Sequence, residues 1–102
     1  MKLKLTYSQF TELYNLFSVV VNHYAPKSIE QKLLFALMRS IYKKLYSQNL
    51  EVKKKYTVKC TDAESIGFLL FFRECQLPNN AIYEANLINQ INSVIYQNLA
   101  KP

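Results

Sequence analysis

The stretch that decides the fold begins at the second residue and runs Lys2-Leu3-Lys4-Leu5-Thr6-Tyr7-Ser8-Gln9. Its first half alternates polar and apolar residues, the two-residue period that places Leu3 and Leu5 on one face of a short strand. Its second half fits the S/T-x-x-E/Q capping box, in which the side chains of Thr6 and Gln9 satisfy free amides at the start of a helix. The sequence therefore predicts a strand followed directly by a helix.

The same pattern returns 55 residues later as Val58-Lys59-Cys60-Thr61-Asp62-Ala63-Glu64. It closes an alternating segment, residues 51–60, which predicts a second strand. In both copies the capped helix is followed by a proline, Pro26 or Pro78, and then by a second helical pattern. These matches indicate a tandem strand-helix-helix duplication with half-repeats 1–50 and 51–102. The alternative is coincidence, since a strand followed by a Thr-capped helix is a common combination.

The first two helices are predicted from apolar residues at spacings of three and four. Pro26 ends the first helix, because the residue before a proline is pushed out of the helical region. Ser28 is a good N-cap for the second helix, which we expect to run to about Ser47. The residues expected to face inward are Phe10, Leu13, Phe17, Val20, Val21 and Tyr24 in the first helix, and Leu34, Leu37, Met38, Ile41 and Leu45 in the second, widened by Leu33, Phe35 and Tyr42.

The third helix contains the apolar run of residues 66–72, and a helix that is apolar on every side belongs in the middle of its domain. Gly67 within this run indicates close packing against the second or fourth helix. Residues 77–80 form a turn by composition. The fourth helix, residues 81–99, is expected to turn Ile88, Ile91, Val94, Ile95 and Leu99 inward.

These elements predict a single helix-rich α+β domain, residues 1–102, with two short strands and four helices. The strands would pair as a ribbon with one face under the helices and two open edges. Its inner residues, expected to pack against Phe71 and Phe72, are Leu3, Leu5, Tyr56, Val58 and Cys60. The alternative architecture is an all-α four-helix bundle in which the alternating stretches are extended linkers.

The chain carries a net charge of +6, and its lysines are concentrated on the predicted strands. The bare face of the ribbon would carry Lys2, Lys4, Lys55 and Lys59, flanked by Lys53 and Lys54. Clustered ammonium groups attract phosphates or an acidic protein surface, although lysines on an edge strand also prevent aggregation.

Tyr42 and Tyr46 lie one helical turn apart beside Lys43 and Lys44, a spacing typical of a half-buried or interface stripe and also suited to stacking on bases. The predicted partner-binding residues are therefore Lys2, Lys4, Lys55, Lys59, Tyr42 and Tyr46.

No catalytic, cofactor-binding or metal-binding residues are predicted, and we do not expect an enzyme. A single glycine excludes the glycine-rich phosphate-binding loops. The only histidine, His23, lies near a predicted helix end, and Cys60 and Cys75 lack any recognised ligand spacing with it. The apolar run is far shorter than the ~20 residues of a membrane span, and no secretory signal is visible. We therefore expect reduced thiols and a cytoplasmic location, or association with a virion if the gene belongs to a phage.

Together these features predict a non-enzymatic protein-interaction or assembly protein. It would be homo-oligomeric or an accessory component of a larger particle such as a phage virion. The aromatic and aliphatic residues exceed what four short helices need, and open strand edges invite another chain. The alternative is a small basic regulatory protein that binds nucleic acid, for which no recognised motif is present.

Overall fold

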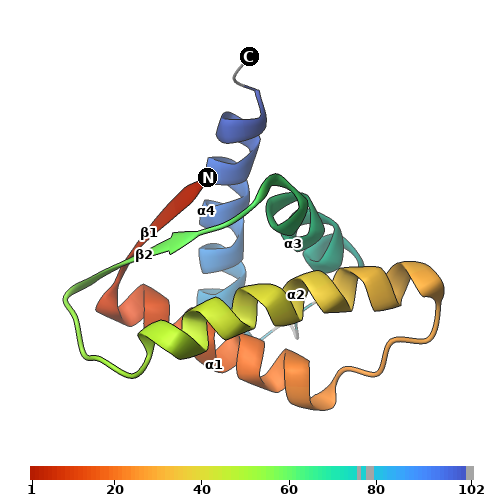
Figure 1. The fold of residues 1–102 in the computed structure, drawn as a ribbon, viewed down its shortest axis with the longest axis horizontal. Helices are drawn as coiled ribbons and strands as arrows, with labels where there is room; N and C mark the ends of the chain where they lie inside the picture. Colours follow the sequence, from red (N-terminus) through yellow and green to blue (C-terminus); the bar gives the residue numbers. More distant parts are fainter. Residues whose placement is uncertain (76, 78–79, 101–102) are drawn as a thin grey trace.

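A computed structural model describes residues 1–75, 77 and 80–100 (Figure 1). The elements in chain order are β1 (Lys2–Thr6), α1 (Tyr7–His23), α2 (Ile29–Gln48), β2 (Lys55–Lys59), α3 (Asp62–Glu74) and α4 (Ile82–Leu99). The helix-rich α+β fold is confirmed, and each half follows the predicted order of strand, helix, helix. The all-α alternative is wrong because the two alternating stretches pair with each other. Pro78 and Asn79 of the predicted turn lie outside the described residues.

Three of the four helices begin with a complete capping box, in which side chain and backbone satisfy each other's hydrogen bonds. The two boxes predicted from the sequence are both present. A third was missed, because only its N-cap residue was recognised. The pairs are Thr6 with Gln9, Thr61 with Glu64, and Ser28 with Gln31. Short local hydrogen bonds thus determine where α1, α2 and α3 begin.

The ribbon is a two-stranded antiparallel sheet in which Leu3 lies opposite Val58 and Leu5 opposite Tyr56. These four side chains are buried, whereas the residues between them are exposed, so the alternation predicted for both strands is confirmed. The Tyr56 ring stacks on Phe10 of α1, with ring centroids 3.9 Å apart. The inner face of the ribbon therefore rests on the helical layer, and its outer face meets solvent.

The contact expected between the ribbon and Phe71 and Phe72 is wrong. Phe71 packs edge-on against Tyr24, with ring centroids 5.1 Å apart, and Phe72 packs against Phe17 at 6.1 Å. The residues of α3 that line the interior together with Leu3 and Val58 are Phe68 and Ser65. The reason is the course of α3, which starts beside the end of β2 and runs away from the ribbon (Figure 1).

Several apolar side chains expected in the core are exposed instead. They are Leu33 (62%), Ile66 (43%), Leu70 (37%), Val94 (39%) and Leu99 (41%). The third helix is therefore not surrounded on every side. Neighbouring helices cover only part of α2 and α3, and the C-terminal end of α4 projects beyond the rest of the molecule (Figure 1).

Close packing of α2 against α3 depends on the single glycine. A Cβ atom placed on Gly67 would lie 2.6 Å from Cδ1 of Leu37 and 3.0 Å from its Cβ. The prediction that Gly67 meets the second or fourth helix is thus confirmed, with the second helix as the neighbour. The close neighbour is a side chain rather than the backbone.

Candidate interaction surface

The ribbon brings the four predicted strand lysines together on its outer face, which we call the lysine face. The antiparallel register places Lys2 directly opposite Lys59, Lys4 opposite Thr57, and Lys55 opposite Thr6. All four lysines are exposed. Within the described residues, no carboxylate lies within ion-pair distance of any of them. Their charge is therefore not neutralised by neighbouring acidic side chains.

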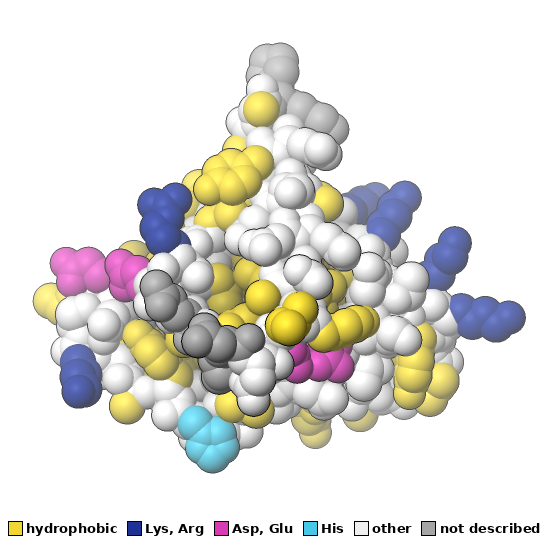
Figure 2. Space-filling view, turned by 180° about the vertical axis from the view of Figure 1, so that it is seen from behind, with side chains coloured by type: hydrophobic (Ala, Val, Ile, Leu, Met, Phe, Trp, Pro, Cys, Tyr) yellow, Lys and Arg dark blue, Asp and Glu magenta, His cyan; other side chains and the backbone are white. Residues whose placement is uncertain are grey.

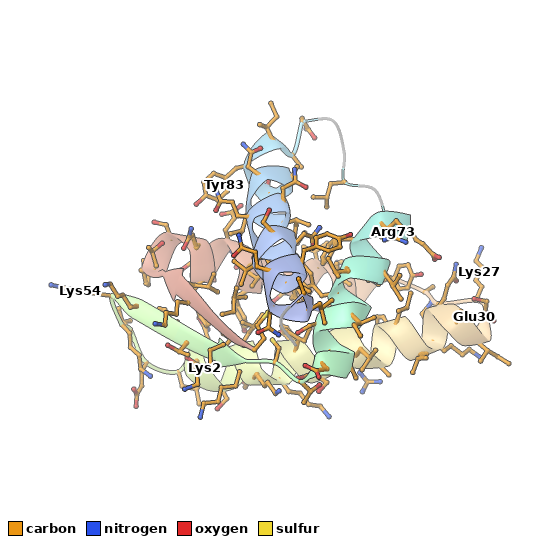
Figure 3. The ribbon with its side chains drawn as sticks, turned by 90° about the horizontal axis from the view of Figure 1, so that it is seen from above. Lys2, Lys27, Glu30, Lys54, Arg73 and Tyr83 are labelled. Carbon is orange, nitrogen blue, oxygen red and sulfur yellow. The ribbon has the colours of Figure 1, made fainter. Side chains whose placement is uncertain are left out.

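Positive charge is concentrated at this side of the molecule. Eight of the thirteen Lys and Arg residues lie on the ribbon, before β2 or near the end of α2, whereas three of the seven acidic residues lie in these segments or at the start of α3. Figure 2 shows basic side chains extending from the side where the ribbon lies. In Figure 3, Lys2 and Lys54 lie at the ribbon, whereas Lys27 and Glu30 lie together at the opposite end. The ribbon side thus carries most of the net charge.

An open groove continues the lysine face toward α2. The residues that line it are Lys43, Lys44, Ser47, Gln48, Thr57 and Lys59. The amide nitrogen of Gln48 donates to the backbone oxygen of Thr57 at 2.7 Å, and Nζ of Lys44 donates to the backbone oxygen of Lys59 at 2.8 Å. Side chains of α2 thus occupy outward carbonyls of β2. The expectation of two open edges therefore holds only in part, because side chains of α2 occupy two carbonyls at the β2 edge.

Glu64 couples the start of α3 to α2 below this groove. Its carboxylate accepts hydrogen bonds from Nζ of Lys44 at 2.5 Å, from Oγ of Ser40 at 2.6 Å and from the backbone N–H of Thr61 at 2.8 Å. Burial alone would raise the pKa of Glu64, but these donors outweigh it and hold the pKa below its ordinary value. Lys44 is therefore engaged within the fold, unlike the four lysines of the ribbon.

Sequence reasoning attributed Glu64 to its helix cap alone and missed its contacts with Lys44 and Ser40. It also missed Gln48 as a residue that binds a backbone carbonyl at the edge of β2. These contacts join residues between 9 and 24 positions apart in the chain. No local sequence signal indicates them, because they depend on how α2 lies against β2 and α3.

Tyr42 and Tyr46 do not share the lysine face. Tyr42 is half-buried against α1, where its ring stacks on Tyr14 at 5.7 Å and its hydroxyl accepts a hydrogen bond from Oγ of Ser18 at 3.3 Å. Tyr46 is 54% exposed, and the two tyrosine ring centroids are 6.3 Å apart. Both rings line a separate hollow, which shares Lys43 with the groove beside the ribbon.

The residues considered for chemistry are dispersed. His23 is exposed at the end of α1, Cys60 is buried, and Cys75 is a half-buried C-cap of α3 rather than part of its buried interior. Burial raises the pKa of both thiols. Among the residues that the structure describes, no three His, Cys, Asp or Glu side chains lie close enough to hold a metal ion. In the same part of the chain, no helix combines the length and apolar character of a bilayer span.

No protein-family model, curated protein or solved structure is detectably similar to this chain. The candidate surface therefore rests on the geometry and charge described above.

Proposed function

We propose that this protein is a non-enzymatic interaction module that binds an acidic surface of a partner protein through its lysine face. The observation that carries the proposal is the gathering of Lys2, Lys4, Lys55 and Lys59 on one exposed sheet face with no acidic counterpart within ion-pair distance among the described residues. Such a face raises the rate of encounter with a negatively charged partner and disfavours positively charged ones.

The lysine face itself is unsuited to self-association. Two copies placed face to face would bring like charges together, which is destabilising. A homo-oligomer would have to form through another part of the surface, for which the exposed apolar residues of α4, such as Val94 and Tyr96, are the candidates. Association with a larger particle is compatible with the same surface, since only the acidic character of the partner is required.

Binding of nucleic acid is the second candidate function, and one observation favours it. Tyr46 is exposed beside Lys43, so an aromatic ring lies next to a cation in the hollow that they share. Bases stack on such rings with about 1–3 kcal/mol each. The lysine face lies across the groove from this ring rather than around it, so we rank this function below binding of an acidic protein.

The test compares two double charge reversals in a titration monitored by fluorescence anisotropy. The probe is a labelled oligoglutamate peptide, and a single-stranded DNA oligonucleotide of equal charge serves as the competing class. Lys55→Glu with Lys59→Glu reverses the lysine face, whereas Lys27→Glu with Lys32→Glu makes the same change at exposed positions outside it. The two variants therefore have identical net charge.

We expect the reversal on the ribbon to weaken peptide binding by about tenfold, since each exposed ion pair contributes about 0.2–1 kcal/mol and reversal adds repulsion. The control pair should change the affinity by less than about threefold. Equal losses in the two variants would contradict the proposal, because they would indicate dependence on net charge alone. Tight binding of the oligonucleotide, lost in a Tyr46→Ala variant, would favour the second function instead.

A further inference from the structure

The two edges of the ribbon are not equivalent. At the edge of β2, side chains of α2 already occupy the carbonyls of Thr57 and Lys59. The edge of β1 has a different environment. In the ladder between the strands, the N–H of Cys60 donates to the oxygen of Met1 at 2.9 Å, and the N–H of Tyr7 donates to the oxygen of Lys54 at 3.1 Å. Odd-numbered residues of β1 therefore bond to β2, and even-numbered ones point their backbone groups away from it.

Lys2 and Lys4 consequently direct their N–H and C=O groups outward from β1. The N–H of Thr6, the next outward residue, is taken by Oε1 of Gln9 at 3.0 Å. Within residues 1–75, 77 and 80–100, no protein group makes a hydrogen bond with the backbone of Lys2 or Lys4 outside the strand. The open edge thus offers two donors and two acceptors in the geometry of an unfinished sheet.

The same two residues carry the side chains of the lysine face, which determines what kind of strand fits this edge. A second copy of β1 would place lysine side chains directly opposite one another, and like charges in that position destabilise pairing. A strand with carboxylates at alternate positions would instead place them opposite Lys2 and Lys4, with Lys59 one strand further away. Charge complementarity therefore favours an acidic extended segment over self-pairing.

We propose that an acidic, extended segment of a partner protein adds to the edge of β1 as the third strand of the sheet. This inference rests on the proposed function and specifies how the partner binds. Backbone hydrogen bonds to Lys2 and Lys4 supply the affinity, as in other cases of strand addition. Carboxylates at every second position of the segment supply the specificity, because only alternate side chains of a strand face the lysines.

The test uses two short peptides of identical composition. One alternates Glu and Val, and the other has its Glu residues grouped at one end. The protein carries any affinity tag at its C-terminus, because the N-terminal amine donates to the backbone oxygen of Cys60. Binding is measured by titration, and amide hydrogen exchange at Lys2 and Lys4 is followed by NMR with and without peptide.

A pair of variants at Lys4 separates the backbone from the charge. Lys4→Gln removes the charge and keeps the outward N–H, whereas Lys4→Pro removes both, and proline is tolerated where the N–H of an edge strand faces solvent. The far-UV CD spectrum and urea midpoint of each variant are compared first. Independently of folding, N-methylation of alternate peptide amides removes donors from the peptide side without altering the protein.

We expect the alternating peptide to bind more tightly than the grouped one, and the amides of Lys2 and Lys4 to exchange at least tenfold more slowly in its presence. Lys4→Pro should bind about fivefold more weakly than Lys4→Gln, the effect of one lost hydrogen bond. N-methylation of every second peptide amide should abolish binding when the methylated amides are those that face β1, and should not when they face away.

Two results would overturn the inference, and they are distinguishable. If both peptides bind equally and in a manner that depends on the lysines, while exchange at Lys2 and Lys4 is unchanged, strand addition is wrong and the proposed function stands. If neither peptide binds, or if the reversal at Lys55 and Lys59 has no effect, the proposed function fails as well.

Discussion

Replacing Glu64 with Gln tests how far the fold depends on the carboxylate that joins α2 to α3. The substitution preserves the shape of the side chain, and Gln is as effective as Glu at the third position of a capping box. The chain itself illustrates this, because Gln9 fills the corresponding position of α1. The bond to the N–H of Thr61 should therefore survive, and the perturbation is confined to the charge that faces Lys44 and Ser40.

The magnitude follows from those two contacts. A hydrogen bond to a charged group contributes about 1.5–3 kcal/mol and a neutral one about 0.5–1.5 kcal/mol, so each contact loses about 1 kcal/mol. The side chain of Lys44 is 36% exposed, so water screens its part of the loss. We therefore expect the free energy of unfolding to fall by about 1–2 kcal/mol. Glu64→Ala also removes the cap and leaves a gap, and should cost about 3 kcal/mol.

The measurement is a urea titration followed by CD. With an m-value of about 1–2 kcal/mol per M for a chain of this size, Glu64→Gln lowers the midpoint by roughly 1 M. The control is Glu30→Gln, an exposed acidic residue in the first turn of α2 with no ion pair among the described residues. It should cost about 0.5 kcal/mol or less. Equal midpoints for Glu64→Gln and Glu30→Gln would refute the reasoning.

The difference in stability between the wild type and Glu64→Gln should depend on pH in one direction. The pKa of Glu64 is lower in the folded protein than in the unfolded chain. Its contribution to stability is therefore fully present above the ordinary carboxylate pKa and is lost as the pH falls through the lowered folded value. The gap in stability between the wild type and Glu64→Gln should shrink on acidification. A difference in stability that widens as the pH falls would contradict a lowered pKa of Glu64 in the folded protein.

Three further predictions concern the core. Gly67→Ala should lower the Tm, because overpacking against Leu37 costs about 1–3 kcal/mol against a helix-propensity gain of about 1 kcal/mol. In a Leu37→Ala background the same change should lower the Tm less, because the contact with Cδ1 is removed and only that with Cβ remains. Phe68→Ala should cost about 3–5 kcal/mol in a urea titration and Leu33→Ala less than about 0.5 kcal/mol. Both are apolar residues of helices, but Phe68 is buried and Leu33 is exposed. Cys60 should react slowly with a thiol reagent at neutral pH, since burial raises its pKa, and fast after unfolding; rapid native labelling would contradict its burial.

The features of the fold that could be predicted from the sequence are those determined by neighbouring residues. The capping boxes at Thr6 and Thr61 act over three residues, and the alternation of Leu3 and Leu5 is a property of one strand. Pro26 likewise acts on the residue before it. These signals were sufficient for the element order and for the sidedness of the ribbon.

The features that escaped prediction depend on which element covers which. Leu33 and Phe68 are both apolar residues in helical patterns. Phe68 is covered by α1 and its neighbours, whereas Leu33 lies in solvent. The hydrogen bond from Gln48 to the carbonyl of Thr57 depends in the same way on where α2 ends relative to β2. Periodicity indicates which face of a helix or strand is apolar, but it does not identify the element that covers that face.

The lysines of the ribbon and Lys44 have the same charge but different roles. Lys44 bonds to Glu64 and to the backbone of β2, so the fold accounts for it. Lys2 and Lys4 make no ion pair or side-chain hydrogen bond among the described residues, so folding stability does not account for them. Protection of an open edge against aggregation would also account for them, and a charge of either sign contributes to such protection. Replacing both with Glu keeps a charge at each edge position, whereas binding of an acidic strand requires the positive sign. A double variant that stays soluble and loses the alternating peptide separates the two roles. Aggregation of this variant, while Lys27→Glu with Lys32→Glu at equal net charge stays soluble, identifies edge protection by lysine as their function.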